Sequence, residues 1–257
     1  MESWELNGVL DNIRYMNYQS QYGQDTFVDQ VVFNRKRNGV FVDIGAYDGI
    51  TFSNSYFFEK YRGFNGFCVE PNPNVYKLLQ KYRSSKNFNV CVGNTSGKVK
   101  FLCVEGYGEM LSCIYDESNV EHLARVDENI KIHGGDKKIE EIDLMTFHQI
   151  IPENLQKIDF FTIDTEGFEF EILKMIDFDR YNISALAVEV NDDAVISFLE
   201  NQGYVAYFKL SCDIIFVKKE LVNASMNFRL LKYKIKNKFK SIIQRFSKFK
   251  SFPIFLL

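Results

Sequence analysis

The sequence predicts an α/β fold in which a mostly parallel β-sheet carries helices on both faces. The first observation is the stretch 39–73, GVFVDIGAYDGITFSNSYFFEKYRGFNGFCVEPNP, whose pattern is that of strand, glycine-bearing turn, helix and strand. The second is that further short apolar runs alternate with helical patterns along the chain, as they do in βαβ units. The third is the length of 257 residues, 46% of them hydrophobic, which is enough for one α/β domain with an appendage.

The first strand and its turn define the ligand side of the predicted sheet. Residues 40–44 are short, apolar and β-rich, as expected of a parallel strand that is buried on both faces. They end in the turn 45–49, where glycines allow a ligand to approach the backbone closely. A helix is predicted from Thr51 or Ser53, both suitable N-caps, to about Tyr61.

Glu70 follows the second predicted strand, residues 66–69. An acid at this strand end can accept hydrogen bonds from two ribose hydroxyls, so we expect a nucleoside across the first two strand ends. The turn lacks the G-x-G-x-x-G pattern of dinucleotide sites, and Asp43 and Asp48 would repel a pyrophosphate. An acidic turn suits a positively charged cofactor instead, such as S-adenosylmethionine (SAM). The alternative is that both acids only cap the helix and face water.

Five segments resemble the FkbM-type family of SAM-dependent methyltransferases in their order and approximate spacing. They are SQYGQD (20–25), FVDIGAYDG (41–49), CVEPNP (68–73), IDFFTIDTEGFEFEIL (158–173) and ALAVEV (185–190). The similarity covers roughly residues 19–217. It implies a class I methyltransferase fold, that is, a Rossmann-like, mostly parallel seven-stranded sheet. It also implies methyl transfer, usually to oxygen, on a small molecule or glycan, without naming the acceptor.

The motifs and the resemblance together give a set of cofactor-binding residues. These are Tyr22, Gln24, Asp43, Gly45, Tyr47, Asp48, Glu70, Asn72, Gly93, Asn94 and Asp164. The resemblance implies that Tyr22, Gln24 and Asp25 touch the methionine end of SAM, although Asp25 is equally well explained as a helix cap. By analogy with the fold, Gly93 and Asn94 lie where the adenine is covered.

Asp164 comes directly after the fourth predicted core strand, at the rim where open α/β sheets bind ligands, so it is expected to face the methyl group. The candidate catalytic residues are Asp164, Glu166, Glu189 and His122, each of which could act as the general base. Glu169 is interpreted as solvated or structural. No metal is included in the predicted site, although the three carboxylates would suit magnesium or calcium; zinc lacks a cluster of His or Cys ligands.

The remaining elements follow from the same patterns. Helices are predicted at 26–33, 74–83, 145–151 and 193–201, and strands at 88–92, 98–104, 109–115, 139–143, 158–163, 185–190, 204–210 and 212–217. The strand at 139–143 is expected at a sheet edge. The irregular stretch 104–138 is the predicted lid on the acceptor side, because loops on a rigid scaffold carry specificity. It contains His122 and Arg125, which resemble an H-x-x-R pair of the family.

Charge divides the chain into a leader (1–18), a methyltransferase domain (19–220) and a basic tail (221–257). All 34 acidic residues lie at or before Glu220, together with 22 of the 31 basic ones, so the body is acidic and the last nine cations belong to the tail. An acidic body disfavours a nucleic-acid substrate. Five cysteines without a C-x-x-C pair indicate reduced thiols, and no signal peptide or spanning segment is recognised, so a cytoplasmic location is expected.

The tail has the pattern of a basic amphipathic helix. Its apolar residues recur at three- and four-residue steps, with lysines between them: Leu231, Ile235, Phe239, Ile242, Ile243, Phe246 and Phe249. Residues 228–250 could lie on an anionic membrane, pack within the protein or an oligomer, or bind another partner.

The predicted function is SAM-dependent O-methylation of a carbohydrate or of a glycan or surface-polymer precursor. The sugar is implied by the resemblance alone. The alternative is a non-catalytic, methyltransferase-like docking or trafficking module that acts through its tail; the set Asp43, Gly45, Glu70 and Asp164 argues against it. An NAD-dependent dehydrogenase is disfavoured by the missing glycine and the acidic turn.

Overall fold

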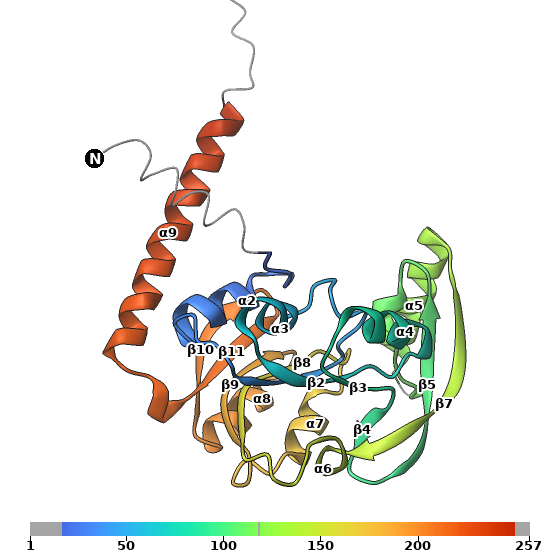
Figure 1. The fold of residues 1–257 in the computed structure, drawn as a ribbon. Coiled ribbons are helices and arrows are strands. Elements are labelled where there is room, and N and C mark those ends of the chain that lie inside the picture. The colour runs from blue at the N-terminus through green and yellow to red at the C-terminus, as the bar shows by residue number, and fades with distance from the viewer. Residues whose placement is uncertain (1–16, 118, 250–257) are drawn as a thin grey trace, which may run out of the picture.

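A seven-stranded sheet forms the centre of the molecule (Figure 1). The computed structural model describes residues 17–117 and 119–249, with side chains as far as Phe239. In the described residues the strand order is β10-β11-β9-β8-β1-β2-β3. All of these strands run in the same direction except β11, which is antiparallel to both β9 and β10. The strands are β1 (Val40–Ile44), β2 (Asn65–Val69), β3 (Lys86–Phe88), β8 (Lys157–Ile163), β9 (Asn182–Glu189), β10 (Tyr204–Leu210) and β11 (Asp213–Lys218). The predicted mostly parallel seven-stranded sheet is confirmed.

Helices cover both faces of this sheet. One face carries α6 (Phe147–Ile150), α7 (Glu169–Met175) and α8 (Asp193–Asn201). The other carries α2 (Gln24–Phe27), the π-helix η1 (Val28–Val32), α3 (Tyr56–Arg62), α4 (Pro73–Tyr82) and the start of α9 (Ala224–Phe249). Parallel strands need such crossovers, and the carboxyl ends of β1, β2, β3, β8 and β9, which run parallel, lie at one edge of the sheet.

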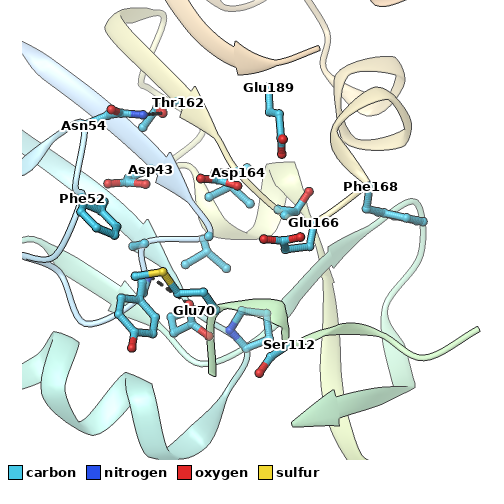
Figure 2. Close-up of a pocket in the computed structure, with 18 of the residues that line it drawn as sticks. Asp43, Phe52, Asn54, Glu70, Ser112, Thr162, Asp164, Glu166, Phe168 and Glu189 are labelled. Atoms are coloured by element: carbon cyan, nitrogen blue, oxygen red, sulfur yellow. Dashed lines mark hydrogen bonds between the residues drawn. The ribbon is translucent and has the colours of Figure 1, made fainter. Parts of the chain in front are cut away.

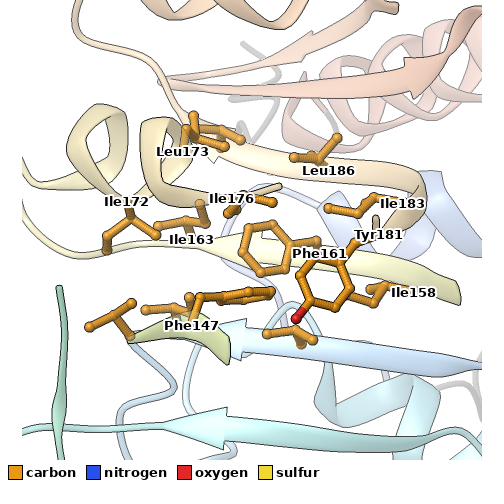
Figure 3. Packing of buried hydrophobic residues seen from close by; sticks show 14 of the residues in the cluster. Phe147, Ile158, Phe161, Ile163, Ile172, Leu173, Ile176, Tyr181, Ile183 and Leu186 are labelled. Carbon is orange, nitrogen blue, oxygen red and sulfur yellow. The ribbon is translucent and has the colours of Figure 1, made fainter. Parts of the chain in front are cut away.

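Successive side chains of the central strands point to opposite faces of the sheet and pack into two separate hydrophobic cores. Val42 of β1 and Phe161 of β8 belong to the core beneath α6, α7 and α8, whereas their neighbours Phe41 and Phe160 belong to the opposite core. In the first core the ring of Phe147 packs edge-on against Phe161 at 5.7 Å between centroids (Figure 3). Because both faces are buried, the strands are apolar along their whole length, which is why they were recognisable in the sequence.

A second, four-stranded sheet stands beside the main one, in the order β4-β7-β5-β6. Its elements are β4 (Cys91–Gly93), β5 (Gly97–Glu105), the 3₁₀-helix η2 (Glu109–Leu111), β6 (Cys113–Ile114) and β7 (Asp136–Thr146). The predicted single strand at 88–92 is therefore wrong, since β3 ends at Phe88 in the main sheet and β4 pairs with β7 in the other. The strand predicted for an edge at 139–143 is the middle of the long β7, where it pairs with β5 on one side only, because β4 pairs with residues 144–146.

The stretch expected to be irregular contains a helix, α5 (Val120–His133). Asn119 caps it by accepting a hydrogen bond from the His122 amide at 3.2 Å, and Val126 anchors it in a small core of its own. A single buried position over 14 residues is a weak periodic signal, so the helix was missed. The predicted start of α3 at Thr51 or Ser53 is also wrong: the helix begins at Tyr56, whose amide donates to Ser53 Oγ.

The tail prediction is confirmed for the helix α9, which follows the 3₁₀-helix η3 (Lys219–Leu221). Asn223 Oδ1 accepts from the amide of Met226 at 3.0 Å and so caps α9. No described helix is both long enough and apolar enough to cross a membrane. The five cysteines are free thiols and four are buried, as the sequence predicted. The predicted leader lies mostly outside the described residues, as do residues 250–257.

Candidate active site

A cavity of about 340 Å³ opens where β1, β2, β8 and β9 end, at the rim predicted from the sequence. Four parts of the chain form its walls: the segment before α2, residues 51–54 before α3, the strand ends of the main sheet with the loop after β8, and residues of the second sheet with η2 and α5. Figure 2 shows Asp164, Glu166 and Glu189 gathered on one side, with Glu70 and Ser112 on another. The volume is in the range of small-molecule sites, about 300–1,000 Å³.

Gly45 is required by a contact between strands. A Cβ at this position would lie 1.7 Å from the backbone carbonyl oxygen of Asp164, and its φ of +84° is one that other residues adopt rarely. The amides of Gly45 and Ala46 both donate to the carbonyl of Val69 at 3.0 Å. The glycine therefore lets the ends of β1, β2 and β8 converge on the cavity, whereas the sequence suggested a direct approach to the ligand.

Asp43 lies at the end of β1, in the cavity wall, and is supported from behind by a buried arginine. Ser55 Oγ donates a short hydrogen bond to Asp43 Oδ2, and Arg83 Nη1 lies 4.0 Å from the same oxygen. Arg83 also binds Glu59 through Nε at 2.7 Å and donates to the carbonyl of Gly49 at 3.2 Å. Burial raises the pKa of Asp43, and the Arg83 charge opposes that shift. The arginine thus ties the turn after β1 to α3 and α4.

Glu70 follows β2 and lines the cavity with both oxygens already oriented. Oε2 accepts from the amide of Tyr47 at 3.0 Å, and Oε1 accepts from the amide of Asn72 at 2.7 Å. Burial raises the pKa of Glu70 to about 7, although these two hydrogen bonds oppose the rise. Each oxygen retains a further lone pair, so the side chain can still accept from two hydroxyls as predicted.

We expect Glu70→Ala to weaken SAM binding by about 10- to 100-fold, because hydrogen bonds to a charged group contribute about 1.5–3 kcal/mol. Isothermal titration of wild type and variant with SAM measures the change in Kd. Glu105→Ala, on β5, is the matched control, since Glu105 is absent from the cavity wall. An unchanged Kd for Glu70→Ala in a folded variant would contradict the assignment of Glu70 to the ribose.

The segment 20–25 places Tyr22 and Gln24 in the cavity wall, as predicted. Gln24 Nε2 donates a short hydrogen bond to Asp213 Oδ2 at the start of β11, which joins this segment to the main sheet. Asp25 points away and is fully buried, where it accepts from the amides of Gln19 at 2.7 Å and Thr26 at 2.6 Å. Asp25 therefore has a structural role, but it is not the helix cap considered from the sequence, because the N-cap of α2 is Gly23 and no side chain caps this helix.

Two of the other expected cofactor residues, Asp48 and Asn72, lie away from the cavity wall. Asp48 Oδ1 accepts from the amides of Ile50 at 2.8 Å and Thr51 at 2.7 Å, so it shapes the turn after β1 and caps no helix, because α3 begins only at Tyr56. Asn72 is buried beneath Glu70 and caps α4 by accepting from Asn74. Tyr47 does line the cavity, and its hydroxyl donates to Glu109 Oε2 at 2.9 Å.

Gly93 and Asn94 line a different hollow, beside α6 and α7. A Cβ on Gly93 would lie 2.6 Å from a methyl carbon of Leu144, so the glycine allows β4 to pack on β7. The residues of this segment that reach the main cavity are Val90, Cys91 and Val92, which come just before it. Their apolar side chains, rather than the pair chosen from the sequence, could cover an aromatic ring.

Three candidate catalytic carboxylates meet at the cavity. Asp164 is exposed to the cavity but otherwise surrounded by protein, and burial together with the charges of Glu189 and Glu166 raises its pKa well above the ordinary value of about 4. Burial, followed by Glu169 and Glu166, raises the pKa of Glu189. Burial also raises the pKa of Glu166, but Arg125 opposes it through an ion pair of 3.1 Å.

Glu169 holds the loop that carries Asp164. Its Oε1 accepts from the amide of Thr165 at 2.7 Å, the Thr165 hydroxyl at 3.0 Å and the amide of Gly167 at 3.1 Å. Glu166, within this loop, has a φ of +56°, an unusual value for a non-glycine residue that the hydrogen bonds maintain. Glu169 is thus structural and buried, not solvated.

Oxygens of Asp164, Glu169 and Glu189 lie within 4.8 Å of one another, a set that could hold a hard cation. The trio differs from the sequence-based one, which had Glu166 in place of Glu169. The same set of negative charges also complements the sulfonium of SAM, and Glu169 already uses one oxygen in three hydrogen bonds.

His122 is outside the cavity wall, and its Nε2 lies 2.9 Å from the carbonyl oxygen of Leu111. Arg125, one turn further along α5, does reach the wall. Of the expected H-x-x-R pair, the structure therefore brings only the arginine to the site, where it links the second sheet to the catalytic rim through Glu166.

Asn54 was missed by sequence analysis. It lies in the cavity wall, where Nδ2 donates to Thr162 Oγ1 at 3.0 Å while the buried Oδ1 has no hydrogen-bond partner (Figure 2). A buried acceptor without a partner indicates a ligand donor group. Asn54 Oδ1, the Glu70 carboxylate and the acidic rim match the amino group, ribose hydroxyls and sulfonium of SAM, so the residues present fit this cofactor. Arg83 was also missed.

Comparisons with known proteins identify the family of this chain. The model of the Methyltransferase FkbM domain matches residues 43–206. Similar solved structures include an FkbM methyltransferase from Methylobacillus flagellatus KT, 14% identical with a TM-score of 0.44; the alignment covers 79% of this chain but 50% of that protein. Another is TrmK of M. capricolum with S-adenosylhomocysteine, 13% identical with a TM-score of 0.36, covering 84% and 86% of the two chains.

A TehB-like SAM-dependent methyltransferase from Corynebacterium glutamicum is 9% identical with a TM-score of 0.39, and the alignment covers 84% of this chain and 98% of the other. No curated protein sequence matches this chain. The family match spans well over half of the 257 residues and confirms the resemblance recognised from the five motifs. The chain belongs to the FkbM family of methyltransferases.

Proposed function

We propose that this methyltransferase acts on a hydroxyl group of a carbohydrate, or of a glycan or surface-polymer precursor. The observation that carries the proposal is the group of carboxylates gathered at the cavity, in which Asp164 has a pKa well above its usual range. A hydroxyl must lose a proton when it is methylated, and a carboxylate with a raised pKa is a stronger base than an ordinary one. An amine of moderate basicity would need no such residue.

SAM supplies an electrophilic methyl group on a positively charged sulfur. The protein must align the acceptor oxygen with that methyl, because displacement is in line. As the new carbon–oxygen bond forms and the carbon–sulfur bond breaks, the hydroxyl proton passes to the Asp164 carboxylate, and S-adenosylhomocysteine leaves. Glu189 keeps the negative potential high beside Asp164, and Glu169 keeps the loop of Asp164 in place.

The acceptor side of the cavity supports a neutral polyol. Beside Asp164 the wall carries the carboxylate oxygens of Glu166 and Glu189, which can accept hydrogen bonds from sugar hydroxyls. Arg125 is the cation there, and Glu166 already pairs with it. An acceptor with its own carboxylate would therefore meet an acidic wall, which disfavours it.

The experiment is a methyl-transfer assay with SAM labelled in the methyl group. Neutral sugars, uronic acids of matched size and aliphatic amines serve as acceptors, and mass spectrometry locates the methyl. We expect label on a hydroxyl of neutral sugars, little on uronic acids and none on amines. Transfer to nitrogen would refute O-methylation, and SAM binding without transfer to any hydroxyl would favour the non-catalytic module. The five free thiols support a reducing compartment such as the cytoplasm for this reaction.

A further inference from the structure

The helix α9 carries apolar residues on two opposite sides. Met226, Leu230 and Tyr233 face the body, where Met226 is buried and the Tyr233 ring packs edge-on against Phe27 at 5.2 Å. Arg229 reinforces this side by donating from Nε to the carbonyl of Val31 at 2.8 Å. These contacts fix the rotation of α9 about its own axis, so the opposite side is held outward.

That outward side is a line of exposed apolar residues. Each residue of an α-helix advances by about 100°, so residues spaced three, four and four apart fall on one line. We call this line the outer stripe; its members and their exposed fractions are Phe228 (56%), Leu231 (54%), Ile235 (47%) and Phe239 (62%). In the sequence, Ile242, Phe246 and Phe249 continue the same spacing. Soluble surfaces rarely place so many large apolar side chains in a row without a partner.

Basic residues border the outer stripe. Lys232 and Lys234 are exposed, and the Lys232 ammonium lies over the Phe228 ring at 4.5 Å from its centroid. The sequence of α9 contains lysines and arginines but no aspartate or glutamate. A long lysine side chain can lay its methylene groups along an apolar surface while the ammonium reaches a negatively charged layer.

We propose that the outer stripe binds the surface of an anionic lipid bilayer, with α9 lying in the plane of the interface. An apolar line flanked by cations matches the two layers of such a surface, the acyl boundary and the negatively charged headgroups. Each lysine or arginine near an anionic bilayer contributes on the order of 1 kcal/mol. The helix of 26 residues, about 39 Å long, extends past α2 and the rest of the body (Figure 1), so much of it can meet a flat surface.

Other occupants fit this surface less well. Two copies of α9 would bring like charges together along the whole contact, which is destabilising. A nucleic acid would use the cations but would gain nothing from the line of Phe, Leu and Ile. The bilayer is the partner that uses both features at once.

The test is sedimentation of the full chain with vesicles of phosphatidylcholine alone or mixed with phosphatidylserine. We expect binding to the mixed vesicles, weakening as salt rises, and at least tenfold weaker binding for the double variant Leu231→Ser/Ile235→Ser. The matched control is Val120→Ser/Ile132→Ser on α5, which removes two comparably exposed apolar side chains from another surface. Lys232→Glu/Lys234→Glu is expected to lose the preference for phosphatidylserine.

All the substituted residues are exposed, so we expect each variant to remain folded. Circular dichroism and an unchanged Kd for SAM check this. Failure of the wild-type chain to sediment with mixed vesicles overturns the proposal, and so does equal loss in the α5 control. If light scattering shows a dimer that Leu231→Ser/Ile235→Ser converts to monomer, the outer stripe binds a second copy and the membrane assignment is wrong. Binding to RNA that depends on the lysines but not on Leu231 or Ile235 would refute it equally.

Discussion

Replacing Arg83 with methionine is expected to lower the free energy of unfolding by about 3–5 kcal/mol, the usual effect of removing one partner from a buried ion pair. The Arg83 side chain is fully buried and joins Glu59 at 2.7 Å to Asp43 at 4.0 Å. Methionine keeps much of the apolar stem but removes the guanidinium, which lies over the Phe41 ring, and so leaves two carboxyl groups without their cation. Since natural domains are stable by only about 5–15 kcal/mol, the change is a large fraction of the total.

Urea denaturation of the two proteins measures this difference. If Arg83→Met fails to fold, Glu59→Gln provides the milder test. Burial raises the pKa of Glu59, but the Arg83 charge and the hydrogen bonds from Ser84 and Arg83 together outweigh burial and hold this pKa at about 2. The double variant Arg83→Met/Glu59→Gln is expected to recover part of the loss, since one unpaired acid is then neutral. A loss below about 1 kcal/mol for Arg83→Met would contradict a structural role, because exposed ion pairs contribute that little.

The parts of the fold that the sequence revealed are those defined by nearby residues. The strand β1, its acidic turn and Glu70 lie within 35 residues of one another and combine a buried apolar run with a strand-end acid. Each of these signals depends on local pattern, and the helix α8 was predicted with the same bounds, Asp193–Asn201, for the same reason.

Contacts between segments that are distant in the sequence could not be predicted from such local patterns. Gly93 was expected beside the adenine, at the end of a strand of the main sheet. It lies instead in the four-stranded sheet, packed against Leu144, which is 51 residues away in the sequence. Arg83 stands at the end of an amphipathic helix, where an arginine usually faces water and the helix dipole, and only the folded chain shows it buried behind Asp43. Likewise, a pattern cannot show that Glu169 turns back onto its own loop.

Asp164→Asn is expected to reduce kcat by about 10²- to 10⁴-fold, the range that a general base contributes. Asparagine has nearly the same shape, so the loop held by Glu169 should remain, but its amide cannot accept the hydroxyl proton. Among the other candidates, His122 lies outside the cavity wall and Glu166 is paired with Arg125. Single-turnover methylation of a neutral sugar, with saturating SAM, measures the loss.

Glu189→Gln is the matched control, because it removes one negative charge from the same cluster. We expect a smaller decrease in kcat for this variant, together with a lower pKa at Asp164, since the charge of Glu189 is one of the causes that raise it. A larger loss for Glu189→Gln than for Asp164→Asn would make Glu189 the base instead.

The pH dependence of kcat independently tests whether Asp164 is the general base. A general base works only when it is deprotonated, so kcat of the wild-type enzyme should fall as pH drops through the raised pKa of Asp164, well above the value of about 4 of an ordinary carboxyl group. In Glu189→Gln the midpoint of this fall should move to lower pH, and in Asp164→Asn it should disappear from the residual activity. A midpoint that stays unchanged in both variants would mean that neither carboxylate takes the proton.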